Sequence, residues 1–88
     1  MEIVFDPAKE RLNRKKHAGI RFEEAATCLL DPMARVREDG DAQGEQRFVL
    51  LGMSRAGRLL VVVYSLRGET VRLISARKPT KYEEKSYA

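Results

Sequence analysis

The stretch RFVLLGMSRAGRLLVVVYSLRGETVRLISAR, residues 47–77, decides the fold. It contains three apolar runs, and the short segments RAG (55–57) and LRG (66–68) separate them. Glycine tolerates the backbone of tight turns, so apolar runs joined in this way predict hairpins. We therefore expect these residues to form three strands of an antiparallel meander.

The residues before this stretch predict two helices and two further strands. EIVF (2–5) is a short strand candidate. DPAKERLNRKKH (6–17) begins with an Asp that can cap a helix and a Pro that suits the first helical position. FEEAATCLL (22–30) repeats apolar residues at helical spacing. MARVRE (33–38) predicts an edge strand, and DGDAQGE (39–45) predicts a polar loop that we expect to be the most flexible segment.

A capping box ends the chain. In TKYE (80–83), Thr80 can cap a short helix and Glu83 can reach back to it. The expected fold is α+β, with two N-terminal helices packed on an antiparallel meander sheet and a short C-terminal helix. Ala8 and Leu12 form the apolar stripe that is expected to dock the first helix on the sheet. We expect residues 1–88 to form one domain.

The central strands are apolar on both faces. FVLLGM (48–53) and LLVVVY (59–64) carry apolar residues at odd and even positions, so both of their faces favour burial. The two N-terminal helices can cover one face, but the C-terminal helix is too short to cover the other. Either a partner chain or a second copy completes the core, or aliphatic side chains stay half exposed, as is common.

The charge distribution is polarised. The chain has 17 Lys and Arg against 13 Asp and Glu, a net charge of +4. Basic residues gather in 9–17 and 72–85, whereas 23–45 is mainly acidic. This balance is compatible with an anionic partner, although many small domains are equally basic.

The single cysteine and the first residues of the chain indicate the cellular compartment in which the protein is expected. The single Cys28 rules out an internal disulfide and favours a reducing compartment. One His and one Cys argue against a zinc site built on those ligands. The first residues lack a signal-peptide pattern, and the longest apolar run is too short to cross a bilayer, so we expect a cytoplasmic protein without membrane contact.

Four polar residues of the first helix share one face. Lys9, Asn13, Lys16 and His17 stand at helical spacing. Such a row could hold a phosphate and accept a proton at the imidazole. It could equally be a solvated helix face whose basic end suits the helix dipole.

The last strand carries two arginines. Strict alternation in VRLISARK (71–78) predicts that one face holds Arg72, Ile74 and Ala76, and the other Val71, Leu73, Ser75 and Arg77. An arginine among apolar neighbours must pair, reach solvent or bind an anion. Arg72 and Arg77 could bind phosphate through their planar forks, or pair with acids of residues 23–45.

These groups suit RNA cleavage without a metal. That reaction needs a base for the 2′-hydroxyl, an acid for the departing 5′-oxygen and cations for the phosphorane charge. Histidine changes charge closest to neutral pH, so His17 suits base or acid work. Lys16, Tyr82 and Tyr87 are possible proton donors. Tyr64 and Cys28 are expected to pack in the core.

The chain as a whole resembles the BrnT family of bacterial type II toxins. The resemblance rests on FDPAK, N..KH (13–17), FEEA followed by DP, GEQRFVLLGMS, GRLLVVV, RLISARK and T..E...Y (80–87). It implies a compact α+β ribonuclease, related in fold to RelE-type toxins, that cuts RNA without a metal and so blocks translation. It also implies a BrnA-type antitoxin that neutralises the toxin by direct binding, with operator DNA bound only through the toxin–antitoxin complex.

The family pattern is matched residue by residue, with three departures. Phe5 stands where a Trp is common, HAGIRF has one extra residue, and Pro79 replaces an Ala. The matching positions are Asp6, Lys9, Asn13, Lys16, His17, Arg67, Arg72, Arg77, Lys78, Thr80, Glu83 and Tyr87.

We therefore expect a metal-independent endoribonuclease without cofactors. The expected catalytic residues are His17, Arg72, Arg77, Lys16 and Tyr87. The residues expected to bind RNA are Lys9, Arg67, Lys78 and Lys81. The alternative is a non-catalytic basic module that binds nucleic acid, and a third possibility is an interaction protein whose basic face meets an acidic partner.

Overall fold

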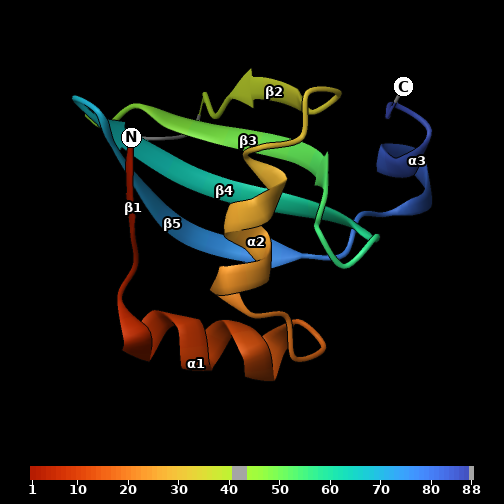
Figure 1. Ribbon diagram of the computed structural model, residues 1–88, viewed down its shortest axis with the longest axis horizontal. Helices are drawn as coiled ribbons and strands as arrows, with labels where there is room; N and C mark the ends of the chain where they lie inside the picture. The colour runs from red at the N-terminus through yellow and green to blue at the C-terminus, as the bar shows by residue number, and fades with distance from the viewer. Residues whose placement is uncertain (41–43, 88) are drawn as a thin grey trace.

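The computed structural model describes residues 1–40 and 44–87, and its centre is a five-stranded sheet with the strand order β1-β5-β4-β3-β2 (Figure 1). The strands are β1 (Glu2–Val4), β2 (Arg35–Glu38), β3 (Arg47–Met53), β4 (Leu59–Arg67) and β5 (Thr70–Arg77). The helices are α1 (Pro7–Lys16), α2 (Phe22–Cys28) and α3 (Lys81–Glu84). Flexibility is predicted for 39–45, and residues 41–43 of this segment lie outside the described residues.

The predicted meander is confirmed. β3 pairs antiparallel with β4, and β4 pairs antiparallel with β5. At one edge of the sheet, β2 pairs antiparallel with β3. Gly57 and Gly68 lie in the connecting turns with φ of 84° and 59°, a conformation that glycine adopts without steric cost. β1 differs, because it pairs parallel with β5 at the opposite edge. The complete sheet is therefore mixed, and its two ends are formed by the first two strands of the chain.

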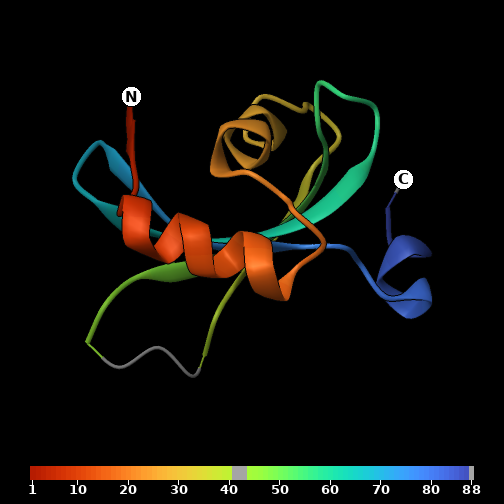
Figure 2. The same cartoon turned by 90° about the horizontal axis from the view of Figure 1, so that it is seen from below.

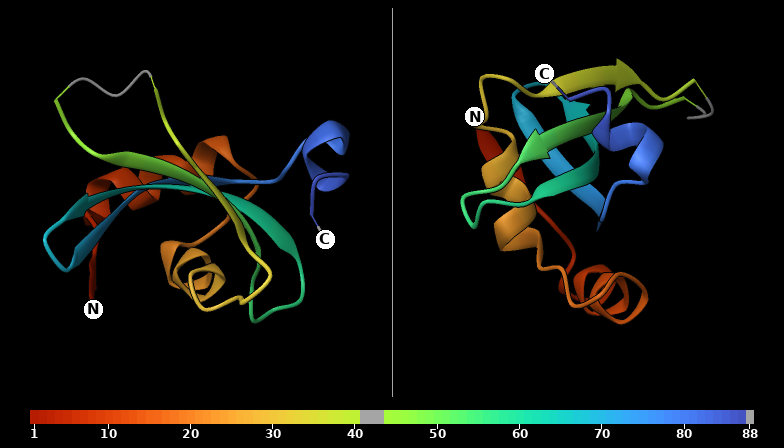
Figure 3. Two further views of the ribbon diagram at one scale, coloured as in Figure 1. Left: turned by 90° about the horizontal axis from the view of Figure 1, so that it is seen from above. Right: turned by 90° about the vertical axis from the view of Figure 1, so that its right-hand side faces the viewer.

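The helices occupy three different positions around the sheet (Figures 2 and 3). α2 lies over one face, α3 lies on the opposite side, and α1 runs beside the part of β5 that β1 does not pair with. Under α2 the core is closed. The fully buried side chains of this layer come from the helix, the preceding loop and the strands: Ile20, Phe22, Ala25, Cys28, Leu60, Val62, Leu73 and Ala76. The expectation that Cys28 packs in the core is thus confirmed.

α1 is docked by an amide and not by the predicted apolar stripe. Ala8 is exposed, and Leu12 is 55% exposed. Asn13 is buried instead, and its side chain donates to the Ala76 carbonyl (2.9 Å) and the Ile20 carbonyl (3.3 Å) and accepts from the Ala76 N–H (3.0 Å). β1 pairs with β5 only as far as Arg72. Beyond that point the Asn13 side-chain amide supplies the hydrogen-bond partners of the Ala76 backbone. The prediction that both N-terminal helices cover one face therefore holds for α2 alone.

α3 covers only part of the other face, as expected from its length. The predicted capping box is present: the Thr80 hydroxyl accepts from the Glu83 N–H, and the Glu83 carboxylate accepts from the Thr80 N–H. Beside α3, Leu51 and Val61 are buried. Val49 and Val63 remain half-buried further along the same strands.

No helix within residues 1–40 and 44–87 is both long and apolar enough to cross a membrane.

Candidate functional site

A bulge in β5 places Arg72 and Arg77 on the same face. Val63 pairs with Ser75, whereas the next residue, Tyr64, pairs with Leu73, so Ile74 is an extra residue in the ladder. A bulge breaks the alternation of side chains between faces.

The register after the bulge corrects the predicted faces. The face away from α2 carries Arg72, Ser75 and Arg77, while the core face carries Val71, Leu73 and Ala76. The assignment by strict alternation, with Arg72 beside Ala76 and Arg77 beside Leu73, is therefore wrong. The local signal is weak, because LIS has no Gly or Pro to mark an irregular strand.

A hollow lies between α1 and β5, and the polar face of α1 predicted from the sequence lines it. Its volume is about 250 Å³, and it is lined by Lys9, Leu12, Asn13, Lys16, His17, Ile74 and Ser75. His17 is half-buried at the C-cap of α1, where its backbone N–H donates to the Asn13 carbonyl (2.8 Å). The predicted sharing of one face by Lys9, Lys16 and His17 is confirmed. These side chains lie against the part of β5 that separates Arg72 from Arg77.

Arg77 is held by a carboxylate of α3. Its two terminal nitrogens each donate to an oxygen of Glu83 at 2.8 Å. This bidentate contact raises the pKa of Arg77 and lowers the pKa of Glu83 to about 2. Arg77 thus pairs with a residue of the last helix, and the predicted alternative, an acid of residues 23–45, is wrong for this arginine.

Arg72 differs from Arg77 in having no partner. It is half-buried, and its side chain makes no hydrogen bond, ion pair or ring contact with the residues that the structure describes. Its cross-strand neighbour on β4 is Ser65, which is fully buried. Of the two arginines, Arg72 is the one available to an anion without the loss of an existing contact.

Tyr87 lies away from the hollow of α1. Its hydroxyl donates to Asp31 Oδ2 (2.5 Å), and the same carboxylate accepts the backbone N–H groups of Met33 and Met53. These contacts lower the pKa of Asp31, and the bond to Asp31 raises the pKa of Tyr87. Tyr87 therefore anchors the C-terminal segment near the end of β3, and the structure does not bring it to His17. Tyr64 packs against Phe48, as predicted, with ring centroids 5.4 Å apart.

The residues expected to bind RNA fall into separate places. Lys9 is exposed on α1, while Lys78 and Lys81 are exposed around the start of α3. Arg67 lies at the turn between β4 and β5, 3.5 Å from Glu45. It stands at the far end of β5 from Arg77, roughly 20 Å away at the usual strand rise.

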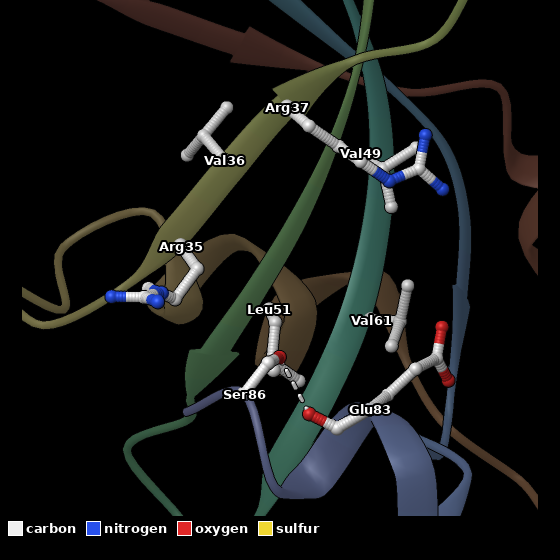
Figure 4. Close-up of a pocket in the computed structure, with 8 residues that line it drawn as sticks. All are labelled: Arg35, Val36, Arg37, Val49, Leu51, Val61, Glu83 and Ser86. Carbon is white, nitrogen blue, oxygen red and sulfur yellow. Dashed lines mark hydrogen bonds between the residues drawn. The ribbon is translucent and has the colours of Figure 1, made fainter. Parts of the chain in front are cut away.

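Sequence reasoning missed two arginines of β2. Arg35 pairs with Leu51 and Arg37 pairs with Val49, so both side chains point to the same face as Arg72 and Arg77. Figure 4 shows them beside a pocket of about 160 Å³, lined by Arg35, Val36, Arg37, Val49, Leu51, Val61, Glu83 and Ser86. Alternation in MARVRE separates these arginines from Val36, and it is the signal that could have found them.

No group of three or more His, Cys, Asp or Glu side chains is placed to hold a metal ion within residues 1–40 and 44–87.

Comparison with known proteins agrees with this architecture. A family model described as "Ribonuclease toxin, BrnT, of type II toxin-antitoxin system" matches residues 5–83. The crystal structure of the Brucella abortus ribonuclease toxin BrnT superposes with a TM-score of 0.69 at 23% identity, over 92% of this chain and 99% of that chain, and so shows the same fold. A search of curated proteins gave no match. On the strength of the family match across most of its length, the chain belongs to the BrnT family of ribonuclease toxins of type II toxin–antitoxin systems.

Proposed function

We propose that this ribonuclease toxin cuts RNA without a metal ion, that the site lies where α1 meets β5, and that the cutting blocks translation. The β5 bulge is the main support for this proposal, because it turns Arg72 and Arg77 to one face. Between them lie Ile74 and Ser75, which line the same hollow as His17 and Lys16. We treat residues 1–88 as one toxin domain that acts in the cytoplasm, where its RNA substrate is found. The relation to RelE-type toxins stays a prediction.

In this proposal His17 moves the proton. The 2′-oxygen of the substrate attacks the adjacent phosphorus, the bond from phosphorus to the 5′-oxygen breaks, and the proton passes from the first oxygen to the second. His17 serves as the base or the acid, and Lys16 on the same face of the hollow supports it as a donor. Arg72 stabilises the charge that develops on the phosphate oxygens.

Arg77 and Tyr87 can take part in the proposed site only after each releases its present partner. Arg77 reaches a phosphate only by exchanging Glu83 for it, and Tyr87 donates a proton only after it leaves Asp31. Both contacts involve the C-terminal segment. A shift of that segment would therefore release both groups together.

RNA is proposed to approach over the exposed basic residues around this site. Lys9 borders the hollow of His17, and Lys78 and Lys81 follow the end of β5. Arg67 extends the path to the other end of the strand. Each phosphate contact of this kind makes binding weaker at higher salt.

Neutralisation is proposed to occur on the sheet face opposite α2. A BrnA-type antitoxin would cover the half-buried Val49 and Val63 on this face. Apolar burial of this kind drives most protein association. Because Arg72 and Arg77 lie on the same face, the antitoxin would also exclude RNA. Any contact with operator DNA would then be made by the toxin–antitoxin complex, through the antitoxin.

RNA cleavage by the purified protein in excess EDTA tests this proposal. We expect cleavage to persist in EDTA, to fall by at least about 100-fold in His17→Ala, and to fall strongly in Arg72→Ala. Lys15→Ala is the matched control, because it removes a charge from α1 at a residue that lines a different hollow, with Arg11 and Arg14. Undiminished cleavage in His17→Ala would refute the site. Intact RNA with salt-sensitive binding would favour a non-catalytic nucleic-acid-binding module.

A further inference from the structure

Three polar side chains form one row across the sheet. Arg47 of β3 pairs with Ser65 of β4, and Ser65 pairs with Arg72 of β5. All three therefore point to the face away from α2. Side chains directly opposite each other on neighbouring strands have their Cβ atoms about 5 Å apart, so Arg47 and Arg72 stand on either side of Ser65.

The row contains donors that have no acceptor. Ser65 is fully buried and its Oγ has no hydrogen-bond partner, and Nε of Arg47 is buried and equally unpaired. Arg72 makes no polar contact with the described residues. Buried polar atoms without partners are uncommon in native proteins, and a cluster of them calls for an explanation. Since the guanidinium groups can only donate and the hydroxyl carries a free O–H, an oxygen-rich anion would satisfy all three side chains.

Glu45 makes long ion pairs beside the row. Its carboxylate lies 3.8 Å from a terminal nitrogen of Arg47 and 3.5 Å from a terminal nitrogen of Arg67. Both distances exceed the 2.8 Å of the Arg77–Glu83 contact. Another terminal nitrogen of Arg47 lies 4.0 Å from Asp39, which has a further interaction of its own. Glu2, on the other side, accepts from the Thr70 hydroxyl at 3.4 Å. Ion pairs of this kind at the surface contribute little free energy, so a phosphate can exchange with them.

We propose that Arg47, Ser65 and Arg72 together bind a phosphate group of the RNA substrate, after the side chains that cover the buried Ser65 hydroxyl move aside. The inference rests on the proposed function, and it adds Arg47 and Ser65 to the phosphate-binding role of Arg72. A phosphodiester suits the row, because its two non-bridging oxygens can accept from both planar forks while one also accepts the serine hydroxyl. On the same face of β5, Ser75 and Arg77 follow Arg72 along the strand. RNA carries successive phosphates that could lie along these residues, whereas a single carboxylate of an acidic protein would occupy only Arg47, Ser65 and Arg72.

Ser65→Ala is the decisive variant, because folding and binding respond in opposite directions. Removing a buried hydroxyl that has no partner leaves stability equal or higher, so the melting temperature should not fall. RNA affinity should fall by about tenfold, since a hydrogen bond to a charged group is lost. The probe is a single-stranded oligoribonucleotide with 2′-O-methyl groups at every position, which the enzyme cannot cut. Its affinity is measured at several salt concentrations.

Arg47→Lys and Arg55→Ala complete the experiment. Arg47→Lys keeps the positive charge but removes Nε and the fork, so affinity should fall with little change in the salt dependence. Arg72→Ala should weaken binding and reduce the slope of log K against log salt by about 0.7. Arg55 is exposed on the turn at the other end of β3, and Arg55→Ala should bind within about twofold of the wild type.

One result would overturn the inference: wild-type affinity for the probe in Ser65→Ala. Weakened binding of the antitoxin by the same variant would then assign the row to an acidic protein. Cleavage in EDTA is measured separately with the wild type at saturating RNA. A failure there would refute the proposed metal-free chemistry, while reduced probe binding in Ser65→Ala would still support the phosphate site.

Discussion

Asn13→Ala should be among the most destabilising substitutions in α1, although the residue lies on a helix that is mostly exposed. The side chain makes three buried hydrogen bonds, two with Ala76 and one with Ile20. At about 1 kcal/mol net for each bond, their loss costs about 3 kcal/mol. The N–H and carbonyl of Ala76 also lose their partner and raise the cost, whereas the better helix propensity of Ala returns about 0.5 kcal/mol.

The expected net loss is therefore about 3 kcal/mol, which is a large part of the total stability of a small domain. For a chain of this size it corresponds to a fall in melting temperature of about 12–24 °C. Urea unfolding followed by circular dichroism measures the free energy, and a thermal scan measures the midpoint. Leu12→Ala is the control at the neighbouring position, and it should cost less than about 1 kcal/mol because Leu12 is 55% exposed. A larger loss in Leu12→Ala than in Asn13→Ala would show that an apolar stripe docks the helix after all.

Two further predictions concern titratable groups. The pKa of Glu83 is lowered from 4.5 to about 2 by its contacts with Arg77 and Thr80, so this stabilisation of α3 is present above about pH 4.5 and is lost as the pH falls toward 2. NMR shifts of residues 81–84 report the detachment, and an unchanged transition in Glu83→Gln would assign it to another group. Burial raises the pKa of Cys28 to about 12, so the native thiol should react with a thiol reagent far more slowly than the urea-unfolded chain does. Equal rates would contradict the buried position of Cys28.

Much of the fold could be predicted because its signals are local. The turns at Gly57 and Gly68, the Asp6 cap of α1 and the capping box at Thr80 are each defined by a few adjacent residues. The pairing of β1 with β5 carries no such signal, since its partners are 68 residues apart. The short strand was predicted, but its position beside the last strand was not.

The candidate site was predicted less completely, because its geometry depends on contacts between distant residues. The shared face of Lys9, Lys16 and His17 follows from helical spacing and is present. The common face of Arg72 and Arg77 depends on a bulge that β4 imposes through register, and alternation alone gave the wrong result. Asn13 was interpreted as a donor in a basic row, because nothing near it in the sequence points to its partner on β5.

The link between Asn13 and Ala76 also sets the order in which the molecule can assemble. The two residues are separated by 63 positions, and a growing chain lengthens by about 5–20 residues per second. While α1 emerges first, its partner strand does not yet exist, and closing so long a loop is slow compared with forming local hairpins. His17 therefore gains a fixed neighbour only when β5 has been made. With the site where α1 meets β5, as proposed, nearly the whole toxin must leave the ribosome before it can attack RNA.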